Sequence, residues 1–262
     1  MMVMDHGPLG HLSIAAHGHA DALAVWLHVG DQPVLVDAGT YLYHSGGPWR
    51  NRFRGTGLHN TLCIDGQDTS RIAGPFNWSR KAHCERIAWK STQSETSACV
   101  RHDGYLASHG LLHERCLVAH ARGFTICDAL IGEATSEGGS RASGIEPRSV
   151  EIGFLVHPDL DVTIDGDKAT ISQQGEALCR LSGGDALGVT LHEGAIEPAR
   201  GWYSERFGSL RAAPQLVFQP RDVGTRRFEI ELEVLAAPAP TRRPKKLSDT
   251  GTARVLAEMA PR

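Results

Sequence analysis

Residues 23–38 read LAVWLHVGDQPVLVDA, and this stretch decides the fold class. Two short apolar runs, rich in β-branched and aromatic side chains, flank the polar turn at residues 30–32. Runs of this kind, separated by a few turn residues that include glycine, are typical of a β-hairpin. The stretch therefore predicts two paired strands, at residues 23–29 and 33–38.

The same pattern continues along the chain as far as residue 235. Strand-length apolar or alternating runs recur between turn signals, and no segment before residue 235 shows a long helical period. The repetition favours an all-β fold, an antiparallel β-sandwich with long loops, over alternating β-α-β units. The further strands are expected at residues 59–66, 83–89, 111–120, 124–130, 150–156, 161–172 (two strands about a D-G-D turn), 186–193, 214–220 and 228–235.

Two segments depart from this pattern. Residues 132–148 are polar and glycine-rich, which indicates a loop or a boundary between two sheet subdomains. Residues 236–262 begin APAPTRRPKK, and we expect a flexible, mostly disordered tail there. The expected organisation is one β-sandwich domain over residues 1–235 followed by this tail.

Composition excludes several classes of partner. The chain has 262 residues and a net charge of −3, so nothing favours nucleic acid or a membrane surface. No apolar run reaches the length of a membrane-spanning helix. The N-terminal segment lacks the cationic and apolar regions of a signal peptide. Because the chemically suggestive residues begin almost at once, we expect a chain that starts inside a larger protein.

The cysteines form no CxxC pair, and several lie in apolar strand-like runs. We interpret them as buried reduced thiols, although their even number leaves a disulfide open if the protein is exported. They are Cys63, Cys84, Cys99, Cys116, Cys127 and Cys179.

The sequence HGHAD at residues 17–21 is the first candidate for chemistry. Alternate residues of an extended segment face the same way, so His17, His19 and Asp21 are expected to converge. Gly18 between the histidines allows a close backbone approach to another group. Imidazole and carboxylate are natural ligands of a zinc-like ion.

Two further residues extend this candidate site. Asp37 ends the apolar strand PVLVD, and His59 begins another strand, so both are expected at neighbouring strand ends. Each has a second interpretation: Asp37 as a cap of the following turn, and His59 as a hydrogen-bonded interior histidine. Together with His19 they form a credible set of three ligands with an open fourth position.

HGHADA also nearly matches the H-x-H-x-D-H motif of the metallo-β-lactamase superfamily. The closing histidine is missing, because position 22 is alanine. That fold also needs helical layers, which the strand-rich pattern does not supply. We therefore do not favour this alternative.

The blocks HGHADA (17–22), VDAGTYLY (36–43) and FRGTGLHNT (53–61), in this order, resemble the heparinase II/III family of polysaccharide lyases. GWYSERFGSLRAAPQLVF at residues 201–218 resembles the family's C-terminal β-sheet region, and the resemblance spans about residues 7–235. It implies a β-sandwich of the super-sandwich type, which in the family follows an N-terminal (α/α) toroid. It also implies β-elimination on uronic-acid-containing glycans, acidic polysaccharide partners, and a periplasmic or secreted location. The toroid is not recognised in this chain.

The resemblance also implies a role for each matching residue. The cleft histidine is His17, and the ligands of a structural zinc are His19, Asp37 and His59. Arg52, Arg54 and Tyr43 are expected to approach the substrate, Tyr41 to pack along the groove, and Asp21 to stabilise a turn or the ligands. Arg52 and Arg54 have a second interpretation, as solvated surface arginines without a role in binding.

β-Elimination removes the proton at C5 of a uronate and expels the oxygen at C4. The uronate carboxylate must be neutralised, a base must take the proton, and an acid must protonate the leaving oxygen. A histidine, with an ordinary pKa near 6.5, can serve as the neutralising group or the base. Because the toroid supplies the other groups, we expect this chain to be inactive by itself. The alternative is a non-catalytic, zinc-stabilised glycan-binding or structural module.

Overall fold

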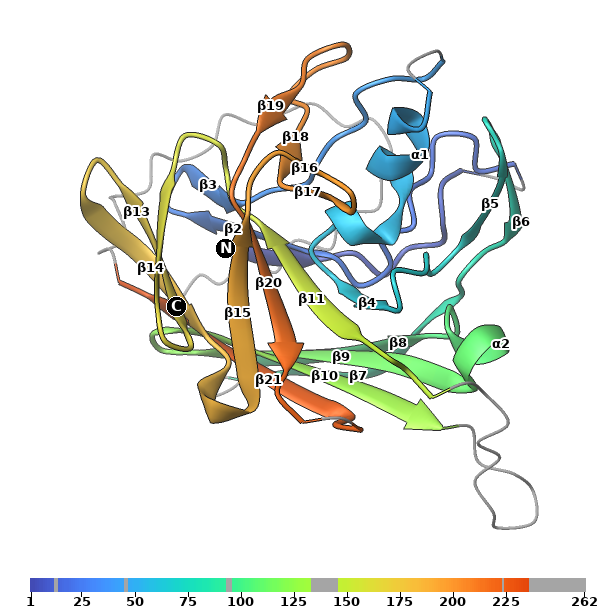
Figure 1. Cartoon of the computed structure of the whole chain (residues 1–262). Helices are drawn as coiled ribbons and strands as arrows, with labels where there is room; N and C mark the ends of the chain where they lie inside the picture. The colour runs from blue at the N-terminus through green and yellow to red at the C-terminus, as the bar shows by residue number, and fades with distance from the viewer. Residues whose placement is uncertain (12–13, 45–46, 93–95, 133–145, 223, 236–262) are drawn as a thin grey trace, which may run out of the picture.

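The computed structural model describes residues 1–11, 14–44, 47–92, 96–132, 146–222 and 224–235. Within these ranges the regular secondary structure consists mostly of antiparallel strands, as expected (Figure 1). The helical elements there are α1 (Trp49–Arg54), α2 (Leu106–His109), and the 3-10 turns η1 (Thr56–Leu58) and η2 (Gly184–Ala186). None of the described helices is long and apolar enough to cross a lipid bilayer.

An eight-stranded antiparallel sheet forms the largest layer. Its strands alternate as half-buried strands should: on β21, Phe228, Ile230 and Leu232 point into the core and the glutamates between them point outward. Burying each such side chain contributes about 1.5–3 kcal/mol. The strands in spatial order are β12 (Asp161–Asp165), β13 (Lys168–Gln173), β14 (Glu176–Ser182), β21 (Arg227–Val234), β10 (Gly123–Gly132), β9 (Leu111–His120), β8 (Thr96–His102) and β7 (Cys84–Ser91).

Two smaller sheets lie over this layer (Figure 1). They meet where the Val36 amide donates to the Leu155 carbonyl at 2.9 Å and Leu35 bridges Val156. The four-stranded sheet has the order β15 (Leu187–His192), β20 (Gln215–Pro220), β11 (Val150–Leu155) and β4 (Leu62–Ile64), and the three-stranded sheet β1 (Met2–Met4), β2 (Val25–Val29) and β3 (Gln32–Leu35). Short ribbons pair β5 (Arg71–Gly74) with β6 (Asn77–Arg80), β16 (Ala195–Ile196) with β17 (Ala199–Arg200), and β18 (Trp202–Tyr203) with β19 (Arg211–Ala212).

One apolar core lies between these layers. Val25, Ile126, Phe154 and Ile230, from all three sheets, are fully buried in the same cluster. The eight-stranded sheet also mixes strands from before and after the glycine-rich loop, so the two halves of the chain share a sheet. Most of the loop predicted at residues 132–148, and the tail predicted at residues 236–262, lie outside the described residues.

Each predicted strand region contains a strand, but some bounds differ. The segment predicted as a strand at 33–38 leaves the ladder after Leu35, and the strand predicted at 59–66 begins only at Leu62. In both places polar residues turn the chain out of the sheet. The sequence pattern did not predict β1, β5, β6, β8 and β14, nor the two-residue strands β16, β17, β18 and β19.

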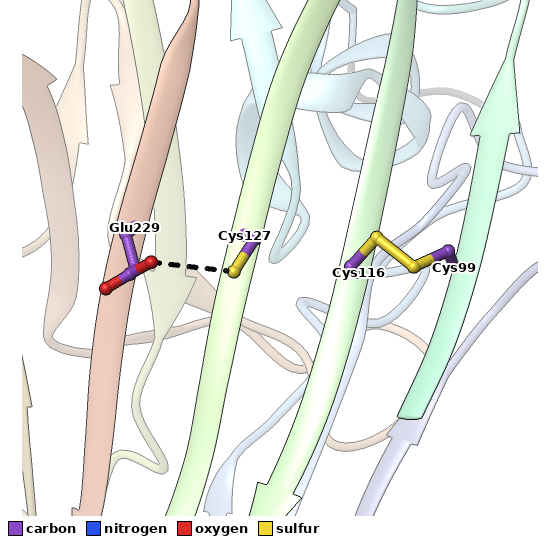
Figure 2. Close-up of a disulfide and its surroundings, with 4 residues drawn as sticks. All are labelled: Cys99, Cys116, Cys127 and Glu229. Carbon is purple, nitrogen blue, oxygen red and sulfur yellow. Dashed lines mark hydrogen bonds between the residues drawn. A yellow bond between two sulfur atoms is a disulfide. The ribbon is translucent and has the colours of Figure 1, made fainter. Parts of the chain in front are cut away.

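The interpretation of all cysteines as reduced thiols is wrong for Cys99 and Cys116. These residues face each other on β8 and β9 and form a disulfide with a Cα–Cα distance of 4.1 Å (Figure 2). The pairing depends on β8, a strand that the sequence pattern did not reveal. Cys63 and Cys179 are buried free thiols, as interpreted, while Cys84 and Cys127 are free and partly exposed.

Candidate metal centre and adjoining pocket

Asp37 is positioned by the turn that follows the N-terminal hairpin. Its Oδ2 accepts a hydrogen bond of 2.8 Å from the Gly39 amide, so the turn-capping interpretation is confirmed. Gly39 has a φ of +83°, and a Cβ there would lie 2.2 Å from the Ser204 carbonyl oxygen. Only glycine fits this conformation and this approach. The turn leaves the second oxygen, Oδ1, free to face His59.

His59 is held in place by its neighbour Asn60. The Asn60 Nδ2 donates to the carbonyls of Val25 and Val36 at 2.8 and 2.9 Å. Its Oδ1 accepts a 2.6 Å bond from the Leu155 amide. One side chain therefore joins the ends of β2, β3 and β11, and it fixes the backbone that carries the imidazole.

His19, Asp37 and His59 come together as the resemblance implies, and we call them the metal cluster. One potential ligand atom from each lies within 4.8 Å of the others. His59 Nδ1 lies 2.7 Å from Asp37 Oδ1, and the rings of His19 and His59 are 5.2 Å apart. His59 Nε2 is buried and has no hydrogen-bond partner among the described residues. Two imidazoles, one carboxylate and an unsatisfied buried nitrogen suit a zinc-like cation.

In the metal cluster the surroundings keep the His19 imidazole neutral and the His59 imidazole protonated at neutral pH. Burial, reinforced by nearby His59, lowers the pKa of His19 to about 4, so the ring is neutral and one of its nitrogens has a lone pair free for a metal. Burial opposes protonation of His59, but the Asp37 carboxylate outweighs it and raises the pKa of His59 to about 9. Burial acts to raise the pKa of Asp37, and the facing imidazole reverses this, so the pKa is lowered. A metal would therefore compete with a proton at His59.

A pocket of about 320 Å³ adjoins the metal cluster, and His17, His19 and Asp21 all line it. Burial, then the charge of Asp5, raises the pKa of Asp21 to about 7, against the opposing effect of His59. The segment is not a strand, and His17 and Asp21 are not members of the metal cluster. Gly18 does make the expected close approach, because a Cβ there would lie 3.1 Å from the Gly10 amide nitrogen.

His17 stands at the exposed rim of this pocket. Its ring meets that of Tyr43 edge-on at 5.0 Å and lies 6.2 Å from the ring of Phe76. Tyr43 is 38% exposed and stacks on Phe207 at 5.4 Å. These aromatic rings fix the surroundings of His17 and leave an apolar surface beside it. Phe76 and Phe207 carry no sequence signal that marks them as part of this site.

The arginines of α1 are divided between two faces of the helix. Arg54 is 3% exposed and donates to the carbonyls of Gly74 and Pro75 at 2.6 and 3.1 Å. Arg52 points the other way, over the ring of Trp49 and toward Glu197. Approach of Arg52 and Arg54 to a substrate stays a prediction, and the contacts of Arg54 give it no support.

Arg50 is the arginine that reaches the surroundings of His17. Its guanidinium lies 4.6 Å from the centre of the Phe76 ring and 5.6 Å from that of Tyr43. It also donates to the Ala16 carbonyl at 3.4 Å, directly before His17. Arg50, Phe53 and Arg54 lie at helical spacing on the buried face of α1, a pattern that could have separated Arg50 from Arg52.

Tyr41 is half-buried and packs against the aromatic side chains of α1. Its ring lies 5.5 Å from that of Phe53 and 6.3 Å from that of Trp49. With Val36, Leu58 and Leu155 nearby, it belongs to a second apolar cluster beneath the loops. This cluster supports the segment that carries Tyr43 to the surface.

Comparison with known proteins agrees with this architecture. The family model described as "Heparinase II/III-like, C-terminal" matches residues 1–248. The heparan sulfate lyase HepC of Pedobacter heparinus matches with a TM-score of 0.67 and 19% identity, over 91% of this chain and 33% of that one. A crystal structure of heparinase III matches with a TM-score of 0.66 and 16% identity, over 91% and 34%. No curated protein matches in sequence.

The chain therefore belongs to the heparinase II/III-like family and carries its C-terminal β-sandwich domain. At these identities the solved structures establish the fold. The chain spans about a third of the length of each structure it matches.

Proposed function

We propose that this chain is the β-sandwich part of a polysaccharide lyase that cleaves uronic-acid-containing glycans by β-elimination. One observation carries the proposal: His17 stands at the rim of the pocket that also contains His19, in a chain whose residues 1–248 match the family. The heparan sulfate lyase among the structural relatives supports an acidic polysaccharide as the substrate. We further propose that the protein acts outside the cytoplasm, in the periplasm or after secretion.

In this proposal His17 is the catalytic residue that this chain contributes. It meets the sugar ring at the pocket rim, and it neutralises the uronate carboxylate or accepts the C5 proton. Each proton transfer of this kind contributes about 10²–10⁴-fold to the rate. The Tyr43 ring, 5.0 Å from the imidazole, orients His17 and presents an apolar face to the sugar.

The metal cluster would hold a structural zinc, with His19, Asp37 and His59 as its ligands. The fit rests on the two imidazoles and one carboxylate within 4.8 Å and on the buried, unpartnered His59 Nε2. When bound, zinc would join three separate segments of the chain. His19 is two residues from His17, so this restraint would fix the backbone that presents the catalytic ring.

The remaining groups of the active site are proposed to come from a helical toroid, as in the family. Proton donation to the leaving oxygen and most contacts that select the glycan would then lie on the other side of the cleft. The 262-residue chain should bind an acidic oligosaccharide weakly and show no turnover without that region.

Elemental analysis of the purified chain tests the zinc proposal. One zinc per chain is expected in the wild type, and His19→Ala should reduce this to a small fraction. His28→Ala is the matched control, since His28 lies on β2 outside the metal cluster. Equal metal content in wild type and His19→Ala would overturn the assignment of His19.

Turnover is tested by the ultraviolet absorbance of the unsaturated product on heparan sulfate and other uronic-acid glycans. Product is expected only when the chain is combined with a toroid region, and His17→Ala should reduce the rate by at least 10²-fold. His120→Ala, at the far end of β9, should leave the rate unchanged. Full activity of His17→Ala would refute its role, and binding without turnover in every combination would favour the non-catalytic module.

A further inference from the structure

Three cysteines and one glutamate form a continuous row across four neighbouring strands of the eight-stranded sheet. Cys99 on β8 faces Cys116 on β9, and Cys116 faces Cys127 on β10 in the strand register. Cys127 in turn faces Glu229 on β21. Figure 2 shows the disulfide between Cys99 and Cys116, with the Cys127 thiol beside it and pointing to Glu229. We call these residues the cysteine row.

The register places Cys127 within disulfide reach of Cys116. A two-residue turn joins β9 to β10, so the closing pair His120–Gly123 is hydrogen-bonded, and the pairing alternates from there. The pair Cys116–Cys127 is therefore also hydrogen-bonded, with a Cα–Cα distance of about 5.5 Å. That separation lies at the mode for disulfides. Cys99 and Cys127 sit two strands apart, at about 10 Å, which no disulfide spans.

We propose that the cysteine row is a thiol–disulfide exchange site, in which the disulfide moves between Cys99–Cys116 and Cys116–Cys127. The Cys127 thiolate attacks Cys116 Sγ, the Cys116–Cys127 bond forms, and the Cys99–Cys116 bond breaks. Cys99 leaves as a thiolate and takes up the proton that Cys127 released. One disulfide and one thiol are present before and after, so no external oxidant or reductant is needed.

The charges around Cys127 hold this exchange back at neutral pH. Burial, followed by the Glu229 carboxylate, raises the pKa of the Cys127 thiol to about 11. The thiol donates a hydrogen bond of 3.9 Å to Glu229 Oε2. Asp128 on the same strand and Glu231 on β21 act in the same direction, and Glu114 on β9 adds a carboxylate two residues from Cys116. The reactive thiolate is therefore scarce, and exchange should accelerate as the pH rises.

The exchange changes what the covalent bond restrains. In the Cys99–Cys116 form it joins β8 to β9, near the β7 edge of the sheet. In the Cys116–Cys127 form it joins β9 to β10, and the free thiol moves to β8. The outward Cys99 thiol then becomes the group that can attack a small disulfide such as glutathione disulfide, which gives a mixed disulfide on Cys99 and releases one glutathione thiol.

Two cysteine variants of the full chain test whether the second bond can form. Cys99→Ser, oxidised with glutathione disulfide, should give a Cys116–Cys127 disulfide in peptide mapping. Cys116→Ser is the matched control and should form no bond between Cys99 and Cys127. Absence of the Cys116–Cys127 disulfide in folded Cys99→Ser would overturn the proposal.

The wild-type chain tests whether the bond migrates. After incubation at pH 9, acid quenching and alkylation, label is expected on Cys99 as well as on Cys127. Cys127→Ser should abolish label on Cys99, while Cys84→Ser, on the opposite face of the sheet, should not. Absence of label on Cys99 at all times would contradict the exchange.

Glu229→Gln tests the restraining charge. Each unit by which the thiol pKa falls raises the thiolate about tenfold and lowers its nucleophilicity about threefold, so exchange near pH 8 should become about threefold faster per unit. Glu233→Gln lies on the same face of the same strand and should leave the rate unchanged. A Glu229→Gln rate equal to that of Glu233→Gln would remove Glu229 from the site.

Discussion

Two histidine–aspartate pairs in this molecule share the same short contact and have different surroundings. His59 Nδ1 lies 2.7 Å from Asp37, and His113 Nε2 lies 2.7 Å from Asp128. The first pair belongs to the metal cluster and leaves His59 Nε2 buried without a partner. In the second pair both ring nitrogens of His113 are hydrogen-bonded. The two pairs contain the same residue types, and they differ in whether every ring nitrogen has a hydrogen-bond partner. A nitrogen without a partner indicates a site for a ligand, and a fully bonded ring indicates a structural role.

The second pair is part of what we call the buried network: His102, His113, Arg115 and Asp128. The Gly104 amide donates to His102 Nδ1 at 2.9 Å, so the proton of that ring is on Nε2. His102 Nε2 then donates to His113 Nδ1 at 3.0 Å, and His113 Nε2 donates to Asp128. Both rings are neutral, and every nitrogen is used.

Arg115 links the two regions. It donates two hydrogen bonds, of 2.7 and 2.8 Å, to Asp128. Its remaining terminal nitrogen donates to the carbonyls of Leu23 and Asn60, each at 2.9 Å. Because Asn60 follows His59, the buried network supports the backbone that presents the metal cluster.

The largest expected effect comes from removing Arg115, because this leaves a buried carboxylate without its cation. Arg115→Leu should lower the free energy of unfolding by about 3–5 kcal/mol in urea denaturation. Arg101→Leu removes an arginine from the exposed pair with Glu85 and should cost at most about 1 kcal/mol. A similar small loss for both variants would show that the buried network is not a structural unit.

The second largest effect is expected from zinc, which should stabilise the protein through the metal cluster and not through the buried network. If only the folded metal cluster binds zinc, a free concentration of a hundred times Kd stabilises the protein by about 2.7 kcal/mol. Thermal unfolding with zinc and with a chelator should show this difference in wild type and lose it in His19→Ala. His28→Ala should keep it. A chelator effect that persists in His19→Ala would place the metal elsewhere.

The pH dependence of stability should report mainly the buried network. Burial, reinforced by His113, lowers the pKa of His102 well below its usual value, and burial lowers that of His113 against the pull of Asp128. Below pH 6.5 the unfolded state binds more protons at these rings, so stability is lost as the pH falls. When the pH falls from 7.5 to 5.5, each ring that stays neutral in the folded state lowers the free energy of unfolding by about 1.4 kcal/mol.

The metal cluster should contribute little to that change in the metal-free protein. His19, with a pKa of about 4, loses stability over the same window. His59, with a pKa of about 9, stays protonated in the folded state. Because the folded state therefore binds more protons at His59 than the unfolded state does, acidification over this window adds a similar amount of stability. Asp21, whose pKa is raised to about 7, takes up a proton in the folded state over the same window and offsets part of this loss, so the measurement uses Asp21→Asn. Urea denaturation of this variant in chelator should show a net loss of up to about 3 kcal/mol. Stability that is flat or rises on acidification would contradict neutral His102 and His113.

The sequence predicts the two regions unequally, and the reason is physical. Alternation of apolar and polar residues marks most strands, and ordered motifs indicate His19, Asp37 and His59. The buried network depends on which strands are neighbours: His102 faces His113, and Arg115 faces Asp128, only through the registers of β8, β9 and β10. β8 reads TSACVRH, whose small and polar residues give no clear alternation. Without β8, neither His102 nor the Cys99–Cys116 disulfide could be placed.

The smallest expected effect concerns Arg52, on the exposed side of α1. Its ion pair is with Glu197, whose side chain is 80% exposed, so Arg52→Ala should change the free energy of unfolding by at most about 1 kcal/mol. Arg50→Ala, on the buried face, should cost more, because it removes the hydrogen bonds of a buried guanidinium to the Ala16 and Pro75 carbonyls and leaves only Arg54 as a donor to Pro75. Equal losses in urea denaturation would mean that the two faces of α1 do not differ. If Arg52 also meets an acidic glycan, its removal should weaken binding at low salt and much less at high salt, since screening suppresses exposed charge pairs.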